Sequence, residues 1–384
     1  MRIQSSINAA TVNGAMTDIS LDDWQSLDGR SVLVTGHTGF KGSWLTLWLD
    51  RLGSRVTGYA LDPPTTPNHF EAARVAEVLA ADLRGDIRDA ELMGKAIEEA
   101  APDVIFHLAA QPIVRQSLRA ARETFDVNVM GTAGLLDAVV ANAKPCVVVV
   151  VTSDKCYRND GQVSAFRELD PLGGHDPYSA SKAGAELVVD SYRSSFFPEG
   201  QIADHGVSVV TVRAGNVVGG GDWAADRIVP DAVRALSAGK DLLVRNPPST
   251  RPWQHVLEPL SGYLTLAVRL LGDTNASEWS GAWNFGPLMS GEATVAELAT
   301  GLVSAWGSGR WLPAGPASGL DVEAKTLRLD INKAVSRLGW VPRWEFHETV
   351  TRTIEWYRSY YQSPSGSMRT RSLDDIAAYE GTAN

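Results

Sequence analysis

A tyrosine and a lysine stand four positions apart in the segment YSASK, as Tyr178 and Lys182. At the start of a predicted helix over 178–197, this spacing places both side chains on one face. A free tyrosine has a pKa of about 10, but a nearby ammonium group stabilises the phenolate and lowers that pKa. The pair therefore predicts a tyrosine base that deprotonates a hydroxyl group while a nicotinamide cofactor accepts its hydride, with Lys182 also placed to hold the ribose of that cofactor.

A second polar group follows an apolar stretch. Five valines at 147–151 come shortly before Ser153, Asp154 and Lys155. In a parallel sheet, ligands bind beyond the carboxyl ends of the strands. Ser153 can hydrogen-bond to the hydroxyl group whose proton Tyr178 takes. Asp154 and Lys155 are not needed for a simple oxidation, so they predict further proton transfers. The structural alternative is a salt bridge at the end of a strand.

A glycine-rich turn, VTGHTGFKGSW, lies between a predicted strand and a predicted helix. Glycines let the backbone approach a pyrophosphate, and the N-terminus of the helix supplies N–H donors and a positive dipole. Because the turn opens a series of alternating strands and helices, it predicts a dinucleotide site rather than an ordinary turn. The predicted contacts are Gly36, Gly39, Phe40 and Gly42.

The rest of the cofactor site is predicted from the ends of the next strands. Asp62 is the acidic candidate for the ribose hydroxyls, although it follows its strand slightly later than usual. No arginine follows that strand closely, which favours NAD and leaves NADP open. The other predicted contacts are Asp86 and Ile87 at the adenine and Leu108, Ala109 and Ala110 over the pyrophosphate and ribose.

The elements that must position these residues alternate along the chain. Apolar stretches at 31–36, 55–61, 103–110 and 207–219 alternate with helical patterns. Strands that are apolar on both faces and separated by helices predict an α/β fold with a doubly wound parallel sheet. After about residue 222 the alternation loosens, which predicts a smaller C-terminal lobe that binds the substrate.

Four segments are predicted from these patterns. Residues 1–28 form a flexible N-terminal extension, and 29–215 form the dinucleotide-binding domain with the catalytic residues. Residues 216–361 mainly form the substrate lobe, interleaved with the first domain. Residues 362–384 form a polar, solvated tail.

Composition excludes several classes of protein. The chain has 384 residues, 44% of them hydrophobic and 21% charged, with a formal net charge of −10. This balance argues against binding of nucleic acid or an anionic membrane surface, and the apolar runs are too short to span a membrane. The two cysteines suggest neither a disulfide framework nor a metal site, so a reducing cytoplasm and no metal are expected.

At these residues the chain resembles the extended short-chain dehydrogenases/reductases that act on nucleotide sugars. The resemblance covers about 28–360 and rests on segments such as TGHTGFKGSWL, TSDKCY, GGHDPYSASKAGAEL and RPWQHVLEPLSGYL. Members that act on dTDP-glucose usually carry Asp-Glu where this chain has Asp154 and Lys155, whereas Asp-Lys is typical of the CDP-glucose 4,6-dehydratase group. The resemblance implies a Rossmann-type fold and this dehydration of a CDP-linked glucose.

The resemblance also implies the order of events. Tyr178 takes the proton of the 4-hydroxyl during oxidation at C4; Lys155 is the candidate base at C5 and Asp154 the candidate acid for the departing 6-hydroxyl, although these two roles can be exchanged. The hydride then returns to C6, so NAD is expected to stay tightly bound and to be regenerated in each cycle. Asn128, in the middle of a helix, is implied to belong to the cofactor site, where it holds backbone through a water; the alternative is a buried polar residue with local hydrogen bonds.

The nucleotide-sugar contacts are predicted in the second half of the chain. Guanidinium groups match phosphate oxygens, so Arg251 is the best clamp for the diphosphate and Arg245 is a weaker one. The family places phosphate contacts at Arg251. The remaining candidates, for the sugar, base, ribose and phosphates in some order, are Asn216, Asp222, Trp223 and Arg227.

Other functions and the assembly stay open at this point. A nucleotide-sugar 4-epimerase or 4-ketoreductase would need Ser153, Tyr178 and Lys182 but no Asp-Lys pair. A binding protein without catalysis would not need the Ser/Tyr/Lys set. By analogy with the family, the long helical patterns near 121–142 and 178–197 predict a homodimer, with a tetramer as the alternative.

Overall fold

The computed structural model describes residues 24–161, 164–272, 276–288, 292–314, 327–363 and 366–381. The strands are β1 (Ser31–Thr35), β2 (Arg55–Ala60), β3 (Ala81–Arg84), β4 (Val104–His107), β5 (Cys146–Val151), β6 (Val207–Ala214), β7 (Val217–Val218), β8 (Leu242–Val244), β9 (Thr250–Arg251), β10 (Gln254–His255), β11 (Gly281–Phe285), β12 (Ala293–Thr294) and β13 (Trp311–Pro313). The α-helices are α2 (Phe40–Arg51), α3 (His69–Ala72), α4 (Ala90–Ala100), α5 (Val114–Arg119), α6 (Ala121–Phe125), α7 (Gly131–Asn142), α8 (Pro177–Ser195), α9 (Ile202–His205), α10 (Ile228–Ser237), α11 (Leu257–Gly272), α12 (Val295–Trp306), α13 (Phe346–Gln362) and α14 (Arg369–Gly381). The short 3₁₀ and π-helical turns are η1 (Gln25–Leu27), η2 (Val75–Val78), η3 (Asp126–Met130), η4 (Asp154–Cys156), η5 (Glu199–Gln201), η6 (Ala276–Trp279) and η8 (Ala334–Leu338).

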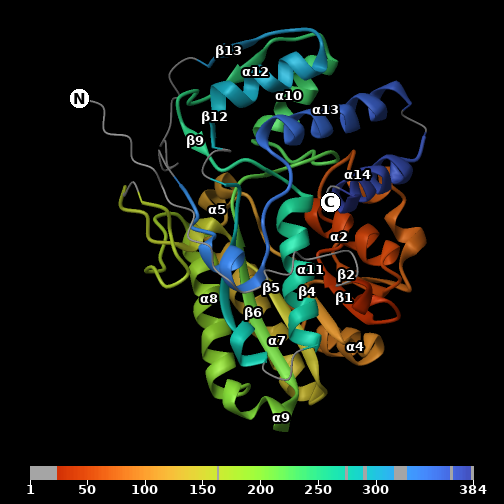
Figure 1. Cartoon of the computed structure of the whole chain (residues 1–384), viewed down its shortest axis with the longest axis vertical. Coiled ribbons are helices and arrows are strands. Elements are labelled where there is room, and N and C mark those ends of the chain that lie inside the picture. Colours follow the sequence, from red (N-terminus) through yellow and green to blue (C-terminus); the bar gives the residue numbers. More distant parts are fainter. Residues whose placement is uncertain are drawn as a thin grey trace, which may run out of the picture.

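The main sheet has seven parallel strands in the order β11-β6-β5-β4-β1-β2-β3 (Figure 1). The chain builds outwards from β1 on one side and from β4 on the other, so the strand order reverses between these two strands. In such sheets the reversal opens a crevice at the carboxyl ends of the strands. The predicted doubly wound, Rossmann-type sheet is therefore confirmed.

The valine strand shows why the sheet is buried on both faces. Val149 and Val151 lie in one hydrophobic core, with residues of α2 and α11, whereas Val148 and Val150 lie in the other, with residues of α4, α7 and α8. Successive side chains of a strand point to opposite faces, so a strand covered by helices on both sides must be apolar at every position. This covering places the polar residues that follow β5 at the edge of the sheet.

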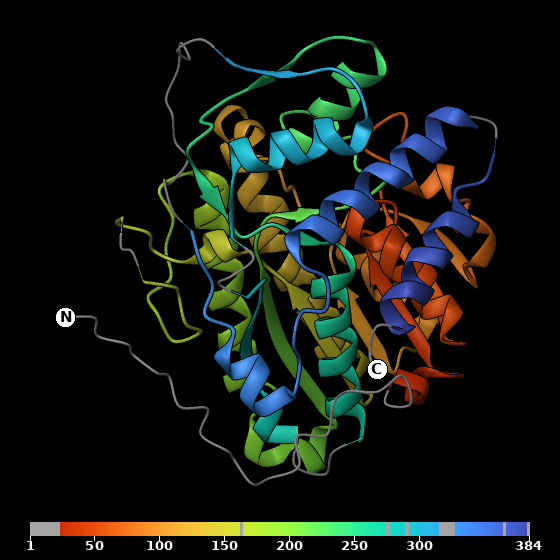
Figure 2. The same ribbon diagram turned by 45° about the horizontal axis from the view of Figure 1, so that its top comes forward.

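A smaller lobe lies beyond the carboxyl ends of the central strands (Figures 1 and 2). It contains α10 and α12 with two short strand pairs, β8 with β13 and β9 with β12. After entering this lobe, the chain returns to the main sheet. The helix α11 packs on the sheet, and β11 adds its last strand beside β6. The lobe and the sheet are thus interleaved.

The prediction of a solvated tail over 362–384 is wrong for α14. Ile376 and Tyr379 are fully buried, and α14 packs against α2 (Figure 2). The Nε1 of Trp48 in α2 donates to the Glu380 carboxylate at 2.9 Å, and the Arg51 Nε donates to the same carboxylate at 2.8 Å. The segment looks polar by itself, because its few apolar residues form a buried face only when α2 is beside it.

The predicted N-terminal extension also ends earlier than expected. Trp24 and Leu27 are buried, and the Trp24 ring packs edge-on against Trp48 with centroids 5.1 Å apart. The Trp24 Nε1 donates to the Thr265 hydroxyl at 3.0 Å. The folded part therefore includes residues 24–28, which the sequence assigned to the extension; residues 1–23 lie outside the described residues.

One helical run in the described residues, 121–142, is long and apolar enough to cross a membrane by length and composition alone. An 18-residue window of this run has a mean hydropathy of 1.2, and 39% of that window is buried inside the protein. This run contains α6, η3 and α7, which pack on α4 and α8. Its apolar character is therefore partly explained by packing within the chain.

The docking of α14 predicts a measurable stability difference. Ile376→Ala should lower the free energy of unfolding by about 2–5 kcal/mol, because it removes a fully buried side chain and leaves a cavity. The matched control is Asp374→Ala, at an exposed position of the same helix, which should change stability by less than about 0.5 kcal/mol. Urea unfolding of both variants measures the difference; equal stabilities would show that α14 does not dock in solution.

Candidate active site

The predicted catalytic helix begins at a defined position. The Asp176 carboxylate accepts a hydrogen bond from the Ser179 backbone N–H at 3.0 Å, and a proline follows at the first helical position. Both features favour the start of a helix. They place Tyr178 in the first turn of α8 and Lys182 one turn later. The Lys182 Nζ donates to the Val151 carbonyl at 3.2 Å, which ties this face of α8 to the end of β5.

The residues after β5 meet Tyr178 there. The Ser153 hydroxyl donates to the Asp154 Oδ1 at 3.1 Å and accepts from the Lys155 backbone N–H at 3.2 Å. It also hydrogen-bonds to Tyr178. The structure thus brings Ser153, Asp154, Tyr178 and Lys182 together at one end of β5, with Lys155 beside them in η4. These are the five residues that the sequence predicted as catalytic.

Burial changes the acidity of the phenol. Tyr178 is buried, and burial raises its pKa to about 12, whereas the hydrogen bond with Ser153 and the charge of Arg227 lower it. Burial also lowers the pKa of Lys182 to about 8. The sequence argument predicted that Lys182 lowers the pKa of Tyr178; for the protein chain alone the direction is opposite, because the loss of solvation of the phenolate is the largest effect.

Asp154 has the environment of a carboxylic acid. Its side chain is 3% exposed, and burial raises its pKa, opposed by Lys155, the Ser153 hydrogen bond, Lys41 and Arg251. Its Oδ2 has no hydrogen-bond partner among the described residues. A buried carboxyl group with a raised pKa keeps its proton to higher pH and can donate it to a leaving group.

A buried ion pair that sequence reasoning missed holds α8 in place. The Glu186 carboxylate, one turn after Lys182, accepts from the Arg213 Nε at 2.8 Å and Nη2 at 2.7 Å. It also accepts from the hydroxyls of Thr152 and Thr211. Burial alone would raise the pKa of Glu186, but these hydrogen bonds and the charge of Arg213 outweigh it and lower the pKa. The sequence signal that could have revealed Glu186 is its position four residues after Lys182, on the same face of the helix.

The glycine turn fits the backbone of a dinucleotide. Gly36 has φ +77°, and a Cβ there would lie 2.7 Å from the Ala109 backbone nitrogen. A Cβ on Gly42 would lie 2.1 Å from the Gly36 carbonyl oxygen. Gly39 is the N-cap of α2, and no side chain caps that end. The turn is therefore a close-packed cradle that leaves helix N–H groups without a capping side chain, as a pyrophosphate requires.

The other predicted cofactor contacts lie at the ends of the strands around this glycine turn. Leu108, Ala109 and Ala110 follow β4 directly, and Ala109 touches the turn at Gly36. Ile87 is buried, but Asp86 faces Arg88, whose guanidinium donates to its carboxylate and lowers its pKa. The structure therefore supports the placement of the backbone contacts and gives Asp86 a partner within the chain.

Asp62 lies two residues after β2, and an arginine accompanies it. The Asp62 side chain is 93% exposed, and its Oδ1 is 3.6 Å from the Arg84 Nη1. The same guanidinium donates to Asp82 at 2.8 Å and to the Leu61 carbonyl at 3.2 Å. No arginine closely follows β2 in sequence, but the neighbouring strand β3 supplies one, which local spacing could not reveal.

Asn128 holds the loop after β4. Its Oδ1 accepts from the Gln111 backbone N–H at 2.8 Å, and its Nδ2 donates to the Gln111 carbonyl and to the Ser181 hydroxyl at 2.9 Å. It therefore links that loop directly to α8. This contact pattern supports a positioning role for Asn128 within the catalytic end of the sheet.

The predicted substrate residues divide into two groups. Arg227 and Arg251 lie close enough to act on the charges of Tyr178 and Asp154 respectively, and Asn216 lies between β6 and β7. Arg227 is held by Asp222 at 2.9 Å. These residues approach the catalytic groups from the smaller lobe.

Trp223 and Arg245 have other surroundings. The Trp223 ring is buried among Trp356, Tyr357 and Tyr360, with the Tyr360 centroid 4.9 Å away. Its Nε1 is buried and has no hydrogen-bond partner among the described residues, and a substrate contact at Trp223 stays a prediction. Arg245 is 40% exposed and lies 3.5 Å from Asp226, so it belongs to the rim of the lobe.

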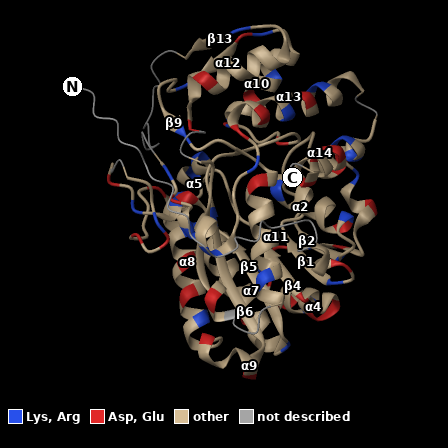
Figure 3. Cartoon of the chain, viewed as in Figure 1, with Lys and Arg blue, Asp and Glu red and all other residues tan. Residues whose placement is uncertain are grey.

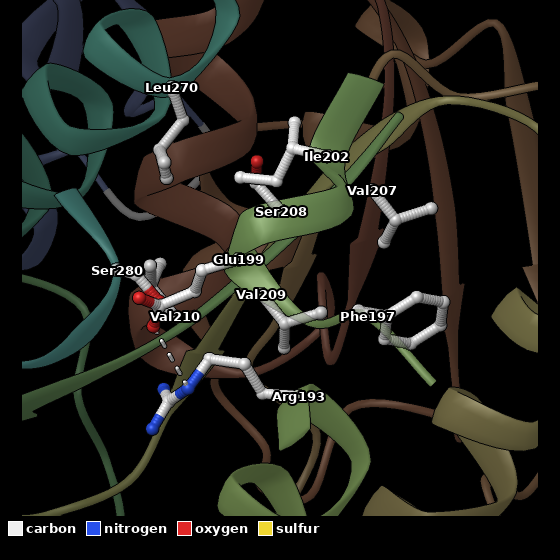
Figure 4. A pocket seen from close by; sticks show the side chains of 10 residues that line it. All are labelled: Arg193, Phe197, Glu199, Ile202, Val207, Ser208, Val209, Val210, Leu270 and Ser280. Carbon is white, nitrogen blue, oxygen red and sulfur yellow. Dashed lines mark ion pairs between the residues drawn. The ribbon is translucent and has the colours of Figure 1, made fainter. Parts of the chain in front are cut away.

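Charged residues of both signs and a small hollow also lie away from this site. Acidic and basic residues are interspersed over the ribbon (Figure 3). A small hollow lined by Arg193, Phe197 and Glu199 lies beside the first residues of β6 (Figure 4). An ion pair of 3.8 Å joins Arg193 and Glu199 there. Because β5 and β6 are parallel, the hollow is at the opposite end of the sheet from Ser153.

Comparison with known proteins agrees with the site. The family model described as GDP-mannose 4,6 dehydratase matches residues 33–273. A CDP-glucose 4,6-dehydratase of Salmonella typhimurium strain LT2 is 48% identical over 340 residues, which cover 88% of this chain and 92% of the relative. A dTDP-glucose 4,6-dehydratase of Streptomyces antibioticus is 30% identical over 337 residues, covering 85% of this chain and 92% of the relative. The crystal structure of a dTDP-glucose 4,6-dehydratase from Streptomyces venezuelae with NAD bound superposes with a TM-score of 0.70 at 27% identity, covering 86% of this chain and 98% of that chain.

The ion pair below the catalytic helix can be tested. Glu186→Ala should lower the free energy of unfolding by about 3–5 kcal/mol, because it leaves the Arg213 charge buried without its partner. Glu98→Ala is the matched control at an exposed position of α4 and should cost less than about 0.5 kcal/mol. The measurement is urea unfolding followed by circular dichroism. A Glu186 variant as stable as the control would mean that the pair does not anchor α8.

Proposed function

The chain belongs to the GDP-mannose 4,6 dehydratase family, and we propose that it is a nucleotide-sugar 4,6-dehydratase that converts CDP-glucose to CDP-4-dehydro-6-deoxyglucose and water. The observation that carries this proposal is the buried Asp154 carboxyl group beside Ser153 and Tyr178. Oxidation of a hydroxyl group needs no such acid. Elimination of water needs a group that protonates the leaving oxygen.

The first step uses the end of β5 and the start of α8. Tyr178, as phenolate, takes the proton of the sugar 4-hydroxyl while Ser153 holds that hydroxyl. Lys182 stands between Tyr178 and the Val151 carbonyl and is placed to hold the ribose next to the nicotinamide. Bound NAD⁺, which Tyr178, Lys182 and the glycine turn would hold, would supply the hydride acceptor for C4 and the hydride donor for C6.

The second step needs two proton transfers. The 4-ketone acidifies the C5 hydrogen, whose proton passes to a base, for which Lys155 is the candidate. Asp154 donates a proton to the 6-hydroxyl, which leaves as water, and the base then returns its proton to C5. Over the cycle Tyr178 gains a proton and Asp154 loses one. Ser153 contacts both groups, so it is the direct route by which that proton can return.

NAD is the proposed cofactor, bound tightly and regenerated in each turnover. The cradle of Gly36 and Gly42 accommodates a pyrophosphate, and the carboxylate of Asp62 suits ribose hydroxyls better than a 2′-phosphate. Arg84 is the one feature here that a 2′-phosphate could use, but it already faces Asp82 and Asp62. NADP therefore remains the weaker candidate.

The choice of CDP-glucose rests on likeness and on charge. The relative that is 48% identical is named a CDP-glucose 4,6-dehydratase, and the Asp154-Lys155 pair is typical of that group. Arg251 and Arg227 supply cations for the diphosphate next to the catalytic groups, and Asn216 lies near them. The reaction class is a hydro-lyase step in deoxysugar synthesis. The two free, buried cysteines fit a cytoplasmic location.

A homodimer is the proposed assembly, formed through the face that contains α6, η3 and α8. Phe125, Met130 and Leu187 are 39%, 61% and 61% exposed on these adjoining elements. Contiguous exposed apolar side chains mark interaction surfaces. A second copy of the chain would pair these helices as a four-helix interface.

The function is tested by mass spectrometry of purified protein with CDP-glucose and catalytic amounts of NAD⁺, beside dTDP-, UDP- and GDP-glucose. The expected result is the loss of one water from CDP-glucose, with no accumulation of NADH. A product with unchanged mass or with two hydrogens fewer would indicate an epimerase or a simple oxidase and would contradict the proposal. Loss of water from dTDP-glucose instead would keep the reaction as proposed and would change only the nucleotide of the proposed substrate.

Asp154→Asn is the matched variant for that experiment. It should slow the loss of water by about 100-fold or more, because an amide cannot protonate the 6-hydroxyl. Oxidation at C4 should persist, since Ser153, Tyr178 and Lys182 are unchanged. Undiminished dehydration by this variant would remove Asp154 from the reaction.

The assembly is tested with Met130→Glu combined with Leu187→Glu. A buried charge is costly at an apolar interface, so sedimentation should show a dimer for the parent protein and a monomer for the double variant. The control is Leu243→Glu, at a 64% exposed position of the smaller lobe. A parent monomer would contradict the proposal, and a tetramer reduced to a dimer would reveal a second interface.

A further inference from the structure

A second lysine reaches the catalytic site from an element that the proposed mechanism uses only for its backbone. Lys41 lies in the first turn of α2, directly after the glycine turn. Its charge acts on Lys182 of α8, Arg227 at the start of α10 and Asp154 of η4. Its Nζ lies 6.0 Å from the centre of the Tyr263 ring in α11. Lys41 therefore projects between four elements towards the catalytic groups.

Nothing in the fold requires a cation at this position. The N-terminus of a helix favours negative charge, and the first turn of α2 contains no acidic residue that would pair with Lys41. Lys41 forms no hydrogen bond or ion pair within the part of the chain that the structure describes. Two cations, Arg227 and Lys182, repel it. A lysine that is half-buried under these conditions costs stability, which points to a functional role.

Asp154 is the one acidic group among the charges that act on Lys41. The Asp154 Oδ2 is buried and has no hydrogen-bond partner in the described residues, and the same holds for the Tyr263 hydroxyl. A Cβ on Gly215 would lie 2.8 Å from that Oδ2, so the carboxyl group is held against the backbone of the lobe. The charged or titratable groups that act on Asp154 are Lys155, Lys41 and Arg251, and Tyr178 and Tyr263 also face it.

Resting on the proposed dehydration, we propose that Lys41, which lies against the Tyr263 ring at the catalytic end of the sheet, is the positioning residue for Asp154: its ammonium group stabilises the carboxylate that forms when Asp154 protonates the departing 6-hydroxyl. The proton moves from Asp154 to the 6-oxygen, the C6–O bond breaks to release water, and the ammonium group of Lys41 stabilises the carboxylate left behind. Lys41 neither gains nor loses a proton in this step.

The acidities of the two groups support this coupling. Burial raises the pKa of Asp154, and Lys41 is one of the cations that lower it. Burial, Arg227 and Lys182 lower the pKa of Lys41 to about 7, whereas Asp154 raises it. Lys41 is charged below about pH 7 and loses its charge above it. The assistance to Asp154 should therefore be present at lower pH and decline as the pH rises through about 7.

The test compares Lys41→Met and Lys41→Arg with the parent enzyme across pH 5.5–9. Lys41→Met should slow the loss of water from CDP-glucose about tenfold or more at pH 6. Lys41→Arg stays charged over this range. It should keep the parent rate at pH 6, and its rate should not fall above pH 7 through loss of the charge at position 41. The CDP-linked 6-deoxyglucose can be oxidised at C4 but has no 6-hydroxyl; its oxidation should be equal in all three proteins.

Two results would overturn the role of Lys41. One is a Lys41→Met enzyme with the parent rate and pH profile of dehydration. The other is an enzyme that has only lost affinity for NAD⁺, measured by calorimetry, with dehydration unchanged at saturation; Lys41 would then be a phosphate contact. Lys95→Met is the matched control, at an exposed lysine of α4 outside the site, and should keep the parent rate and pH profile.

A second readout does not depend on the substrate. In protein labelled with ¹³C at aspartate carboxyl carbons, the signal that disappears in Asp154→Asn reports the titration of Asp154. Its midpoint should move to higher pH in Lys41→Met and stay near the parent value in Lys41→Arg. An unmoved midpoint would refute the coupling. If instead the midpoint moves but the parent enzyme dehydrates no nucleotide sugar, the proposed function fails while the coupling stands.

Discussion

The buried ion pair between Glu186 and Arg213 is the interaction on which the catalytic end of the molecule depends. It joins α8, which presents Tyr178 and Lys182, to β6, and its carboxylate also accepts from the hydroxyl of Thr152 at the end of β5. A buried charge pair is tolerated only when its hydrogen bonds are satisfied. Here four donors surround one carboxylate. The relative position of helix and strand ends is therefore set by hydrogen-bond geometry as well as by apolar packing.

Burial has two opposite effects at this site. It excludes water, which strengthens the electrostatic interactions between the catalytic groups. It also disfavours the charged form of each group, so that the pKa values of Tyr178 and Asp154 rise and those of Lys182 and Lys41 fall. The result brings acids and amines closer in acidity than they would be in water. The free-energy difference for proton transfer between such groups is then smaller in both directions.

The cofactor cradle follows from a different constraint, the close approach of two strand ends. At the reversal of strand order, the turn after β1 packs on the backbone after β4, with no room for a Cβ at Gly36. Helix α2 begins directly after this glycine turn, so its N-terminal N–H groups and the Lys41 side chain come from the same segment. A single local structure thus supplies both the phosphate-binding backbone and a cation at the catalytic end.

The sequence by itself determined the features that depend on near neighbours: the parallel α/β sheet, the glycine turn, and the spacing of Tyr178 and Lys182 on one helical face. These follow from periodicity and backbone geometry, which act over a few residues. Only the tertiary structure decided that Lys41 reaches the catalytic end of the sheet, that burial raises the pKa of the phenol, and that Ile376 docks in a helix the sequence assigned to a solvated tail. Each of these features depends on exclusion of water or on contacts between distant segments. The local spacing of residues encodes neither of these two effects.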